Sequence, residues 1–239
     1  MQVKNHIGFT EVGRRENNED YILTDYEGKF DITVVCDGVG GAQKGEVASE
    51  LVCKEIATFL RSQDFINDEV LFASINHISS CLDAYVQSNP YSDGMATTLT
   101  MAIVDGDVVH VIHIGDSKIL CIQNGQLSYE SYDHSLVNEM VETGLISQAE
   151  ALVHPKRNVI TKALAAGMKA PEPTFFTLRD WNPGDAVFLC TDGVLESFTV
   201  DELFGILNSH EDDQTIVNRI SATCKTNSKD NSSGYLIRF

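Results

Sequence analysis

The chain of 239 residues can form one large or two small domains with a sizeable core, and it is strongly acidic, with a formal net charge of −18 at pH 7. That charge argues against a nucleic-acid backbone or an anionic membrane as a partner, because both are bound by basic patches. Apolar stretches stay far short of the roughly 20 residues of a membrane helix, and the N-terminus lacks the apolar core of a signal peptide, so we expect a cytoplasmic protein.

The N-terminal part of the chain alternates apolar runs with polar ones. We expect a strand over residues 7–12, a dense polar segment over 13–20 and a second apolar run at 21–23. A polar segment of this kind is usually a solvated turn. Because this one lies between two expected strands, its acids Glu19 and Asp20 are alternatively predicted to face the edge of a sheet.

The apolar run at 33–36 is typical of a strand buried on both faces, and it ends at Asp37, which is followed by Gly38, Val39, Gly40 and Gly41. A carboxylate at the end of a buried strand has a fixed direction, and the glycines allow a tight turn and the close approach of a ligand. A similar segment, 186–193, ends in Asp192 and Gly193. The two segments predict two carboxylates directed at one place.

The remaining elements follow from hydrophobic periodicity and turn residues. In chain order we expect helices at 44–61 and 69–86, strands at 97–104, 108–114, 119–123 and 127–132, helices at 135–143 and from 147, strands at 175–178 and 185–190, helices at 200–207 and 215–224, and a strand at 235–239. Asn124-Gly125 is a hairpin signal, and Ser147 with Glu150 has the form of a capping box. Repeats and low-complexity linkers are absent from the sequence, so we expect one domain, a sandwich of two sets of strands with helical outer layers.

The cysteines and the strand histidines argue against a zinc site. None of the six cysteines forms a CxxC pair and most lie in apolar runs, so we interpret them as reduced core residues. His110 and His113 differ by three positions and therefore point to opposite faces of one strand.

Acids that join or follow the expected strands form the candidate site. They are Glu19, Asp20, Asp37, Asp116, Asp192 and Asp230. Such an oxygen-rich set, without matching Cys or His, suits Mg²⁺ or Mn²⁺ rather than Zn²⁺. A carboxylate that bridges two such ions about 4 Å apart makes a water between them a usable nucleophile. On the residues alone, a metal site and a set of solvated acids are equally open.

These motifs, in this order, resemble the bacterial members of the metal-dependent protein phosphatases, the PPM family of type 2C serine/threonine phosphatases. The resemblance covers nearly the whole chain, and seven motifs in family order are specific where one would be weak. They lie at residues 13–20, 36–41 with 45–49, 94–99, 115–117, 133–137, 191–193 and 229–231.

The resemblance implies an α+β fold, a four-layer α-β-β-α sandwich of two antiparallel sheets flanked by helices. It implies a single catalytic domain over residues 1–239, with a flap subdomain at about 135–175 beside the cleft. The implied reaction is the hydrolysis of phosphoserine or phosphothreonine in proteins by a water activated at a dinuclear Mn²⁺ or Mg²⁺ centre. The implied partners are a phosphorylated protein and, through it, a serine/threonine kinase or its targets. We expect a monomer.

The resemblance also assigns the metal ligands. Asp37 would bridge the two ions and is thereby catalytic, while Gly38 would add its backbone carbonyl. Asp192 and Asp230 would complete the coordination of one ion, and Glu19 would support the other.

The resemblance implies further roles for three residues. Asp20 would hold metal-bound waters, Arg15 would bind the substrate phosphate as a catalytic and substrate-binding residue, and Asp116 would help to hold a third ion. Two departures leave details open, because Val39 replaces a histidine proposed as the general acid in many eukaryotic members and Glu196 replaces an aspartate of many bacterial members. The alternative function is a phosphatase-like regulatory binding module with little catalysis.

Overall fold

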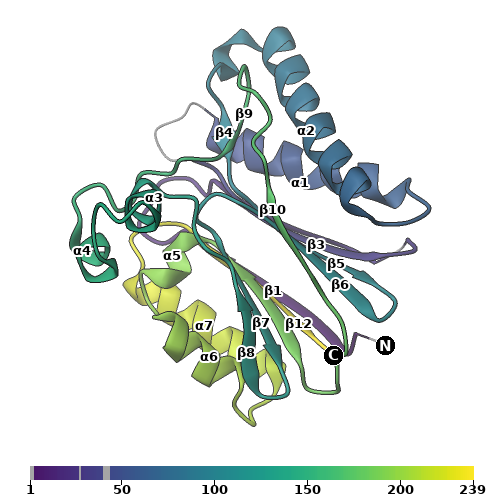
Figure 1. The fold of residues 1–239 in the computed structure, drawn as a ribbon, viewed down its shortest axis with the longest axis vertical. Coiled ribbons are helices and arrows are strands. Elements are labelled where there is room, and N and C mark those ends of the chain that lie inside the picture. The colour runs from purple at the N-terminus through teal and green to yellow at the C-terminus, as the bar shows by residue number, and fades with distance from the viewer. Residues whose placement is uncertain (1–2, 27, 40–43) are drawn as a thin grey trace.

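Two five-stranded antiparallel sheets form the centre of the structure, a computed structural model that describes residues 3–26, 28–39 and 44–239 (Figure 1). Gly40 and Gly41 of the expected glycine run lie outside these ranges. The first sheet has the order β1 (Asn5–Glu11), β12 (Ser232–Arg238), β11 (Ala186–Cys190), β7 (Lys118–Gln123) and β8 (Gln126–Glu130). The second has the order β10 (Thr174–Leu178), β6 (Val108–Ile114), β5 (Leu99–Asp105), β3 (Asp31–Asp37) and β2 (Asp20–Asp25).

Helices cover the outer face of each sheet, so the predicted four-layer α+β sandwich is confirmed (Figure 1). The second sheet is covered by α1 (Gly45–Arg61) and α2 (Asp68–Ser88), and the first by α6 (Val200–Leu207) and α7 (Asp213–Asn227). Shorter elements connect these layers: η1 (Pro90–Ser92), β4 (Ala96–Thr97), α3 (Leu136–Glu142), α4 (Gln148–Val153), β9 (Leu164–Ala165) and α5 (Asp192–Leu195). Within the described ranges, no helix is both long enough and apolar enough to cross a membrane.

Successive side chains of a strand point to opposite faces of its sheet. The buried side chains therefore form three hydrophobic cores, one under the helices of each sheet and one between the sheets. On β3, Val34 packs under α1 and α2, while Val35 faces the other sheet. On β11, Phe188 packs under α6 and α7, while Leu189 faces inward between the sheets. Because both faces of these central strands are covered, they read as continuous apolar runs in the sequence, as predicted.

Most expected elements are confirmed, and two of the differences bear on the candidate site. The strand at 108–114, the helix at 200–207, the capping box of Ser147 and the turn at Asn124-Gly125 are found as predicted. The last strand, β12, begins at Ser232, three residues earlier than expected, and the short helix α5 was not predicted. Both differences lie beside the candidate site, and they determine where its acids point.

Candidate active site

The predicted acids meet at one end of the two sheets because each lies where a strand begins or ends. Asp37 is the last residue of β3, and Asp20, the first of β2, is directly opposite it in the strand register. Asp116 follows β6, Asp192 follows β11, and Asp230 precedes β12. The antiparallel pairing therefore brings residues that are up to 210 positions apart to a common edge.

A cleft of about 320 Å³ opens at this edge, and all but one of the residues predicted for the site line it. Asp20 is the exception, because its carboxyl is buried beneath the cleft, where it accepts a hydrogen bond from the Thr191 hydroxyl (2.9 Å). The cleft is lined by Arg15, Glu19, Asp37, Gly38, Val39, Thr98, Asp116, Asn158, Ile160, Asp192 and Asp230.

Backbone hydrogen bonds hold Asp37 at the base of the cleft. Its N–H donates to the Thr98 hydroxyl oxygen (3.0 Å), and its carbonyl accepts from the Thr98 N–H (2.9 Å) and the Thr97 hydroxyl (2.8 Å). The Thr98 hydroxyl also contacts the Ser117 hydroxyl (2.8 Å), in the turn that carries Asp116. Two of the acids are thus positioned by one small polar cluster.

Burial and mutual repulsion make the acid cluster difficult to ionise. Burial, followed by the nearby Asp20, Asp192 and Asp116, raises the pKa of Asp37 well above its usual value. Burial also raises the pKa of Asp20 and of Asp116 to about 7 and that of Asp192 to about 6. In such a site the ionised form of these carboxylates needs a compensating positive charge.

The oxygen atoms of the cluster fit a hard divalent cation. Among the described residues, Asp20 Oδ1 and Asp116 Oδ1 are buried and have no hydrogen-bond partner. A buried, unpaired carboxylate oxygen costs free energy unless a donor or a cation satisfies it. Because the acids contribute only oxygen donors, Mg²⁺ or Mn²⁺ suits the cleft.

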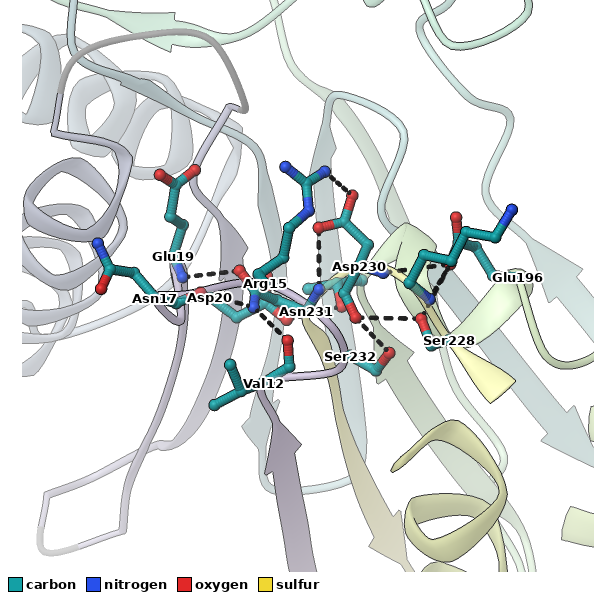
Figure 2. A network of polar contacts seen from close by, with 12 residues as sticks. Val12, Arg15, Asn17, Glu19, Asp20, Glu196, Ser228, Asp230, Asn231 and Ser232 are labelled. Atoms are coloured by element: carbon teal, nitrogen blue, oxygen red, sulfur yellow. Dashed lines mark hydrogen bonds and ion pairs between the residues drawn. The ribbon is translucent and has the colours of Figure 1, made fainter. Parts of the chain in front are cut away.

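Asn231 fastens the two loops that carry the outer residues of the site, although no role was predicted for it (Figure 2). Its side-chain Nδ2 donates to the carbonyls of Val12 (2.8 Å) and Asn17 (2.9 Å), and its Oδ1 accepts from the Glu19 N–H (2.9 Å). The loop between β1 and β2 is therefore held against the loop that precedes β12.

Arg15 lies across the mouth of the cleft and pairs with Asp230. Its Nη2 donates to Asp230 Oδ2 (2.6 Å), while Asp230 Oδ1 accepts from the Asn231 N–H (2.9 Å; Figure 2). The hydrogen bond to Asp230 raises the pKa of Arg15, so the guanidinium keeps its charge. The arginine is half-exposed, and its fork can reach a ligand in the cleft if the Asp230 contact is exchanged.

Glu196 has a role that its residue type alone did not reveal. Its Oε2 accepts from the N–H groups of Lys229 (2.7 Å) and Asp230 (3.2 Å) and from the Ser228 hydroxyl (3.0 Å; Figure 2). Burial alone would raise its pKa, but these hydrogen bonds lower the pKa of Glu196 below its usual value. The extra methylene relative to aspartate lets this side chain hold the loop that carries Asp230.

His134 fixes the start of the segment at 135–175 to the sheet edge. Its Nδ1 accepts from the Gly115 N–H (3.1 Å), its Nε2 lies 3.0 Å from the Thr174 hydroxyl, and its ring stacks on His113 with centroids 4.8 Å apart. Burial lowers the pKa of His134 to about 4, so the ring is neutral near pH 7. These contacts favour a positioning role rather than proton transfer.

A matched pair of glycine substitutions tests how closely the loops are packed. A Cβ at Gly193 would overlap the backbone carbonyl oxygen of Asn231, whereas a Cβ at Gly205, within α6, would meet no atom within 4 Å. We expect Gly193→Ala to lower the free energy of unfolding by about 3 kcal/mol, the upper end of the usual cost of overpacking, since the backbone must move. We expect Gly205→Ala to raise it by about 0.5–1 kcal/mol. Urea unfolding measures both values, and equal stabilities would contradict the packing described above.

The sequence matches the family model for protein phosphatase 2C over residues 7–233. It is 34% identical over 208 residues to a putative protein phosphatase 2C-type of Streptococcus pyogenes serotype M6, and the match covers 84% of this chain and 82% of that protein.

Solved structures share the fold over nearly the whole chain. The crystal structure of the serine/threonine phosphatase Stp1 from Staphylococcus aureus superposes with a TM-score of 0.88 at 29% identity, covering 100% of this chain and 96% of that chain. The catalytic domain of the serine/threonine protein phosphatase PstP, in complex with two manganese ions, superposes with a TM-score of 0.81 at 27% identity, covering 99% and 98% of the two chains.

Proposed function

Because the chain belongs to the protein phosphatase 2C family of metal-dependent phosphoprotein phosphatases, we propose that it hydrolyses phosphoserine and phosphothreonine in proteins at its acid-lined cleft, with two Mn²⁺ or Mg²⁺ ions. The observation that carries this proposal is the convergence of the predicted acids on one cleft with buried, unpaired oxygens. The complete acid set argues against a regulatory binding module with little catalysis.

The residues at the base of the cleft would hold the ions. Asp37 would serve both ions and Gly38 would add its backbone carbonyl, while Asp192 and Asp230 would complete one ion and Glu19 would support the other. When bound, the ions would supply Lewis acidity toward the phosphate and a nucleophile at neutral pH.

Two further acids would act around this pair. Asp20, beneath the cleft, would order solvent at the ions, and Asp116 would contribute to a third ion. Asp116 is available for this role because its Oδ1 is buried without a partner among the described residues.

Residues at the mouth of the cleft would bind and orient the substrate. Arg15 would exchange its bond with Asp230 for the oxygens of the phosphoryl group. A second hollow of about 470 Å³ adjoins the cleft, and Arg157 and Lys229 contribute positive charge to its lining. We propose that this hollow, beside a flap formed by residues 135–175, receives the peptide that flanks the phosphorylated residue. The protein would act as a monomer on the products of a serine/threonine kinase.

Release of phosphate from a phosphothreonine peptide tests the proposed function. We expect turnover with Mn²⁺ and its loss when a chelator in excess removes the ion. If the peptide binds in the presence of Mn²⁺ but no phosphate is released, the protein is a binding module and the proposal fails.

Replacing Arg15 tests the phosphate contact. We expect Arg15→Ala to raise KM for a phosphothreonine peptide about 10–100-fold, because a hydrogen bond to a charged group contributes roughly 1.5–3 kcal/mol. Arg14→Ala is the matched control, since Arg14 is also exposed but does not line the cleft. Steady-state kinetics of both variants checks the prediction, and equal KM values would remove Arg15 from substrate binding.

A further inference from the structure

Three potential metal ligands meet on the outer helical layer, away from the acid-lined cleft. Glu55 lies on α1, and His77 and Cys81 lie on α2, one helical turn apart on the same face. Their ligand atoms all lie within 4.8 Å of one another. Five of the six cysteines are buried, and Cys81 is the partly exposed one, so this sulfur can meet an ion from solvent.

The spacing of the three ligand atoms is close to that of a tetrahedral ion site. Cys81 Sγ lies 3.5 Å from His77 Nε2 and 4.0 Å from Glu55 Oε2, and His77 Nε2 lies 3.8 Å from Glu55 Oε2. Tetrahedral Zn²⁺, with ligand bonds of about 2.0–2.3 Å, needs edges of roughly 3.3–3.6 Å between its donors. Movements of a few tenths of an ångström in three partly exposed side chains close that difference.

The orientation of the histidine is already set. The His77 ring stacks on Phe59 of α1, with centroids 5.0 Å apart and an interplanar angle of 30°. This stacking directs Nε2 toward Cys81 and Glu55 before any ion arrives. Preorganised ligands lose less side-chain entropy when they bind.

We propose that Glu55, His77 and Cys81 form a second metal site, which binds Zn²⁺ or a similar thiophilic divalent cation across α1 and α2. A thiolate, an imidazole and a carboxylate are the donors that Zn²⁺ prefers, whereas Mg²⁺ prefers oxygen alone. The three side chains are partly exposed, so solvent completes the fourth position. This site differs from the catalytic cleft in its donor chemistry and in the elements that carry it (Figure 1).

Binding at this site has a defined proton balance. Burial and the nearby Glu55 raise the pKa of Cys81, so the free thiol is protonated near pH 7. The sulfur–metal bond replaces the S–H bond, and one proton passes to the solvent. Once the ion is bound, the ligands are a thiolate, a carboxylate and an imidazole nitrogen, so two negative charges balance the two positive charges of the ion.

An ion held here cross-links the two helices of the outer layer. Two residues beyond Cys81, Asp83 accepts a hydrogen bond from the Gly167 N–H (2.7 Å), which ties α2 to the chain that follows β9. We therefore expect Zn²⁺ to raise the melting temperature of the reduced protein when excess Mg²⁺ already fills the catalytic cleft.

Titration with Co²⁺ tests the proposal without reference to catalytic activity. The reduced, full chain is titrated in excess Mg²⁺, which has little affinity for a thiolate. A thiolate bound to Co²⁺ absorbs in the near ultraviolet by charge transfer, and oxygen ligands do not produce this band. We expect the band to saturate at one Co²⁺ per chain and to be lost when Zn²⁺ displaces the Co²⁺.

Three variants make the result specific to this cluster. Cys81→Ser should abolish the band, and Glu55→Gln should weaken Co²⁺ binding by at least about tenfold. Glu50→Gln, an exposed acid of the same helix, is the matched control for Glu55→Gln and should leave the affinity unchanged. If wild-type protein shows no charge-transfer band at saturating Co²⁺, or if the band persists in Cys81→Ser, the proposal is wrong.

Discussion

Replacing Asp37 with asparagine is expected to reduce phosphatase activity by about 10²–10³-fold and, in the absence of metal, to stabilise the fold. Asp37 lies at the centre of the acid cluster, and burial, followed by three neighbouring acids, raises its pKa. Asparagine cannot supply the negative charge that two divalent ions require, and the loss of one charge-stabilising group in an active site commonly costs 10²–10³-fold. In the metal-free protein the same change removes a buried carboxyl whose ionised form is unfavourable, so folding no longer has to shift its protonation near neutral pH.

The two effects have opposite signs, so they separate loss of function from loss of structure. Phosphate release with Mn²⁺ measures the first effect, and thermal unfolding in chelator measures the second. Asp107→Asn, in the exposed turn between β5 and β6, should change neither. Full activity of Asp37→Asn would exclude Asp37 from catalysis. A lower melting temperature of the chelated variant would show instead that Asp37 is structurally required.

Replacing Asp116 with asparagine is expected to stabilise the chelated protein by an amount that grows with pH. The pKa of Asp116 rises from 3.8 to about 7 on folding, chiefly through burial. The folded state therefore binds more protons than the unfolded state, and wild-type stability falls as pH rises from about 4 to about 7. At about 1.4 kcal/mol per pKa unit, the advantage of the variant approaches roughly 4 kcal/mol above pH 7 and vanishes below pH 4.

Comparing the variant with the wild type at each pH is essential, because other groups titrate in the same range. Burial lowers the pKa of His113 to about 3 and that of His134 to about 4, so both histidines favour folding as pH rises to about 6.5. Their contribution is common to both proteins and cancels in the difference. Urea unfolding in chelator at pH 5, 6, 7 and 8 measures the result. A difference that does not change with pH would show that Asp116 ionises freely, and excess Mn²⁺ should reduce the difference at pH 8.

The sequence predicted the fold where local pattern and tertiary context agree. The strand at 108–114 and the helix at 200–207 have regular periodicity and clear turn or capping residues, and the structure reproduces their bounds. The early start of β12 was missed because Ser232, Ser233 and Gly234 are weak strand formers. Pairing with β1 and β11 on both sides holds these residues extended. Glycine is needed at position 234, because a Cβ there would lie 2.7 Å from the Phe9 ring.

The acids of the site could be predicted from the sequence, but the residues that hold their loops in place could not. An acid next to a buried strand is visible in a single sequence, and this pattern identified Asp37 and Asp192. The role of Asn231 depends on partners 212–219 positions away, and no local pattern records such contacts. Glu196 was noted only as a longer replacement for aspartate, whereas its length is what allows it to reach the backbone of the Asp230 loop.

The pairing of β1 with β12 also determines when the fold can be completed during protein synthesis. Residues 12–231 separate the two strands. At about 5–20 residues per second, β1 is therefore synthesised roughly 10–45 s before β12. During that interval the edge of β1 that later pairs with β12 is also unpaired, and it is a target for chaperones and for aggregation. The loops joined by Asn231 cannot meet until the same moment. We therefore expect nascent chains to lack phosphatase activity until β12 has emerged from the ribosome.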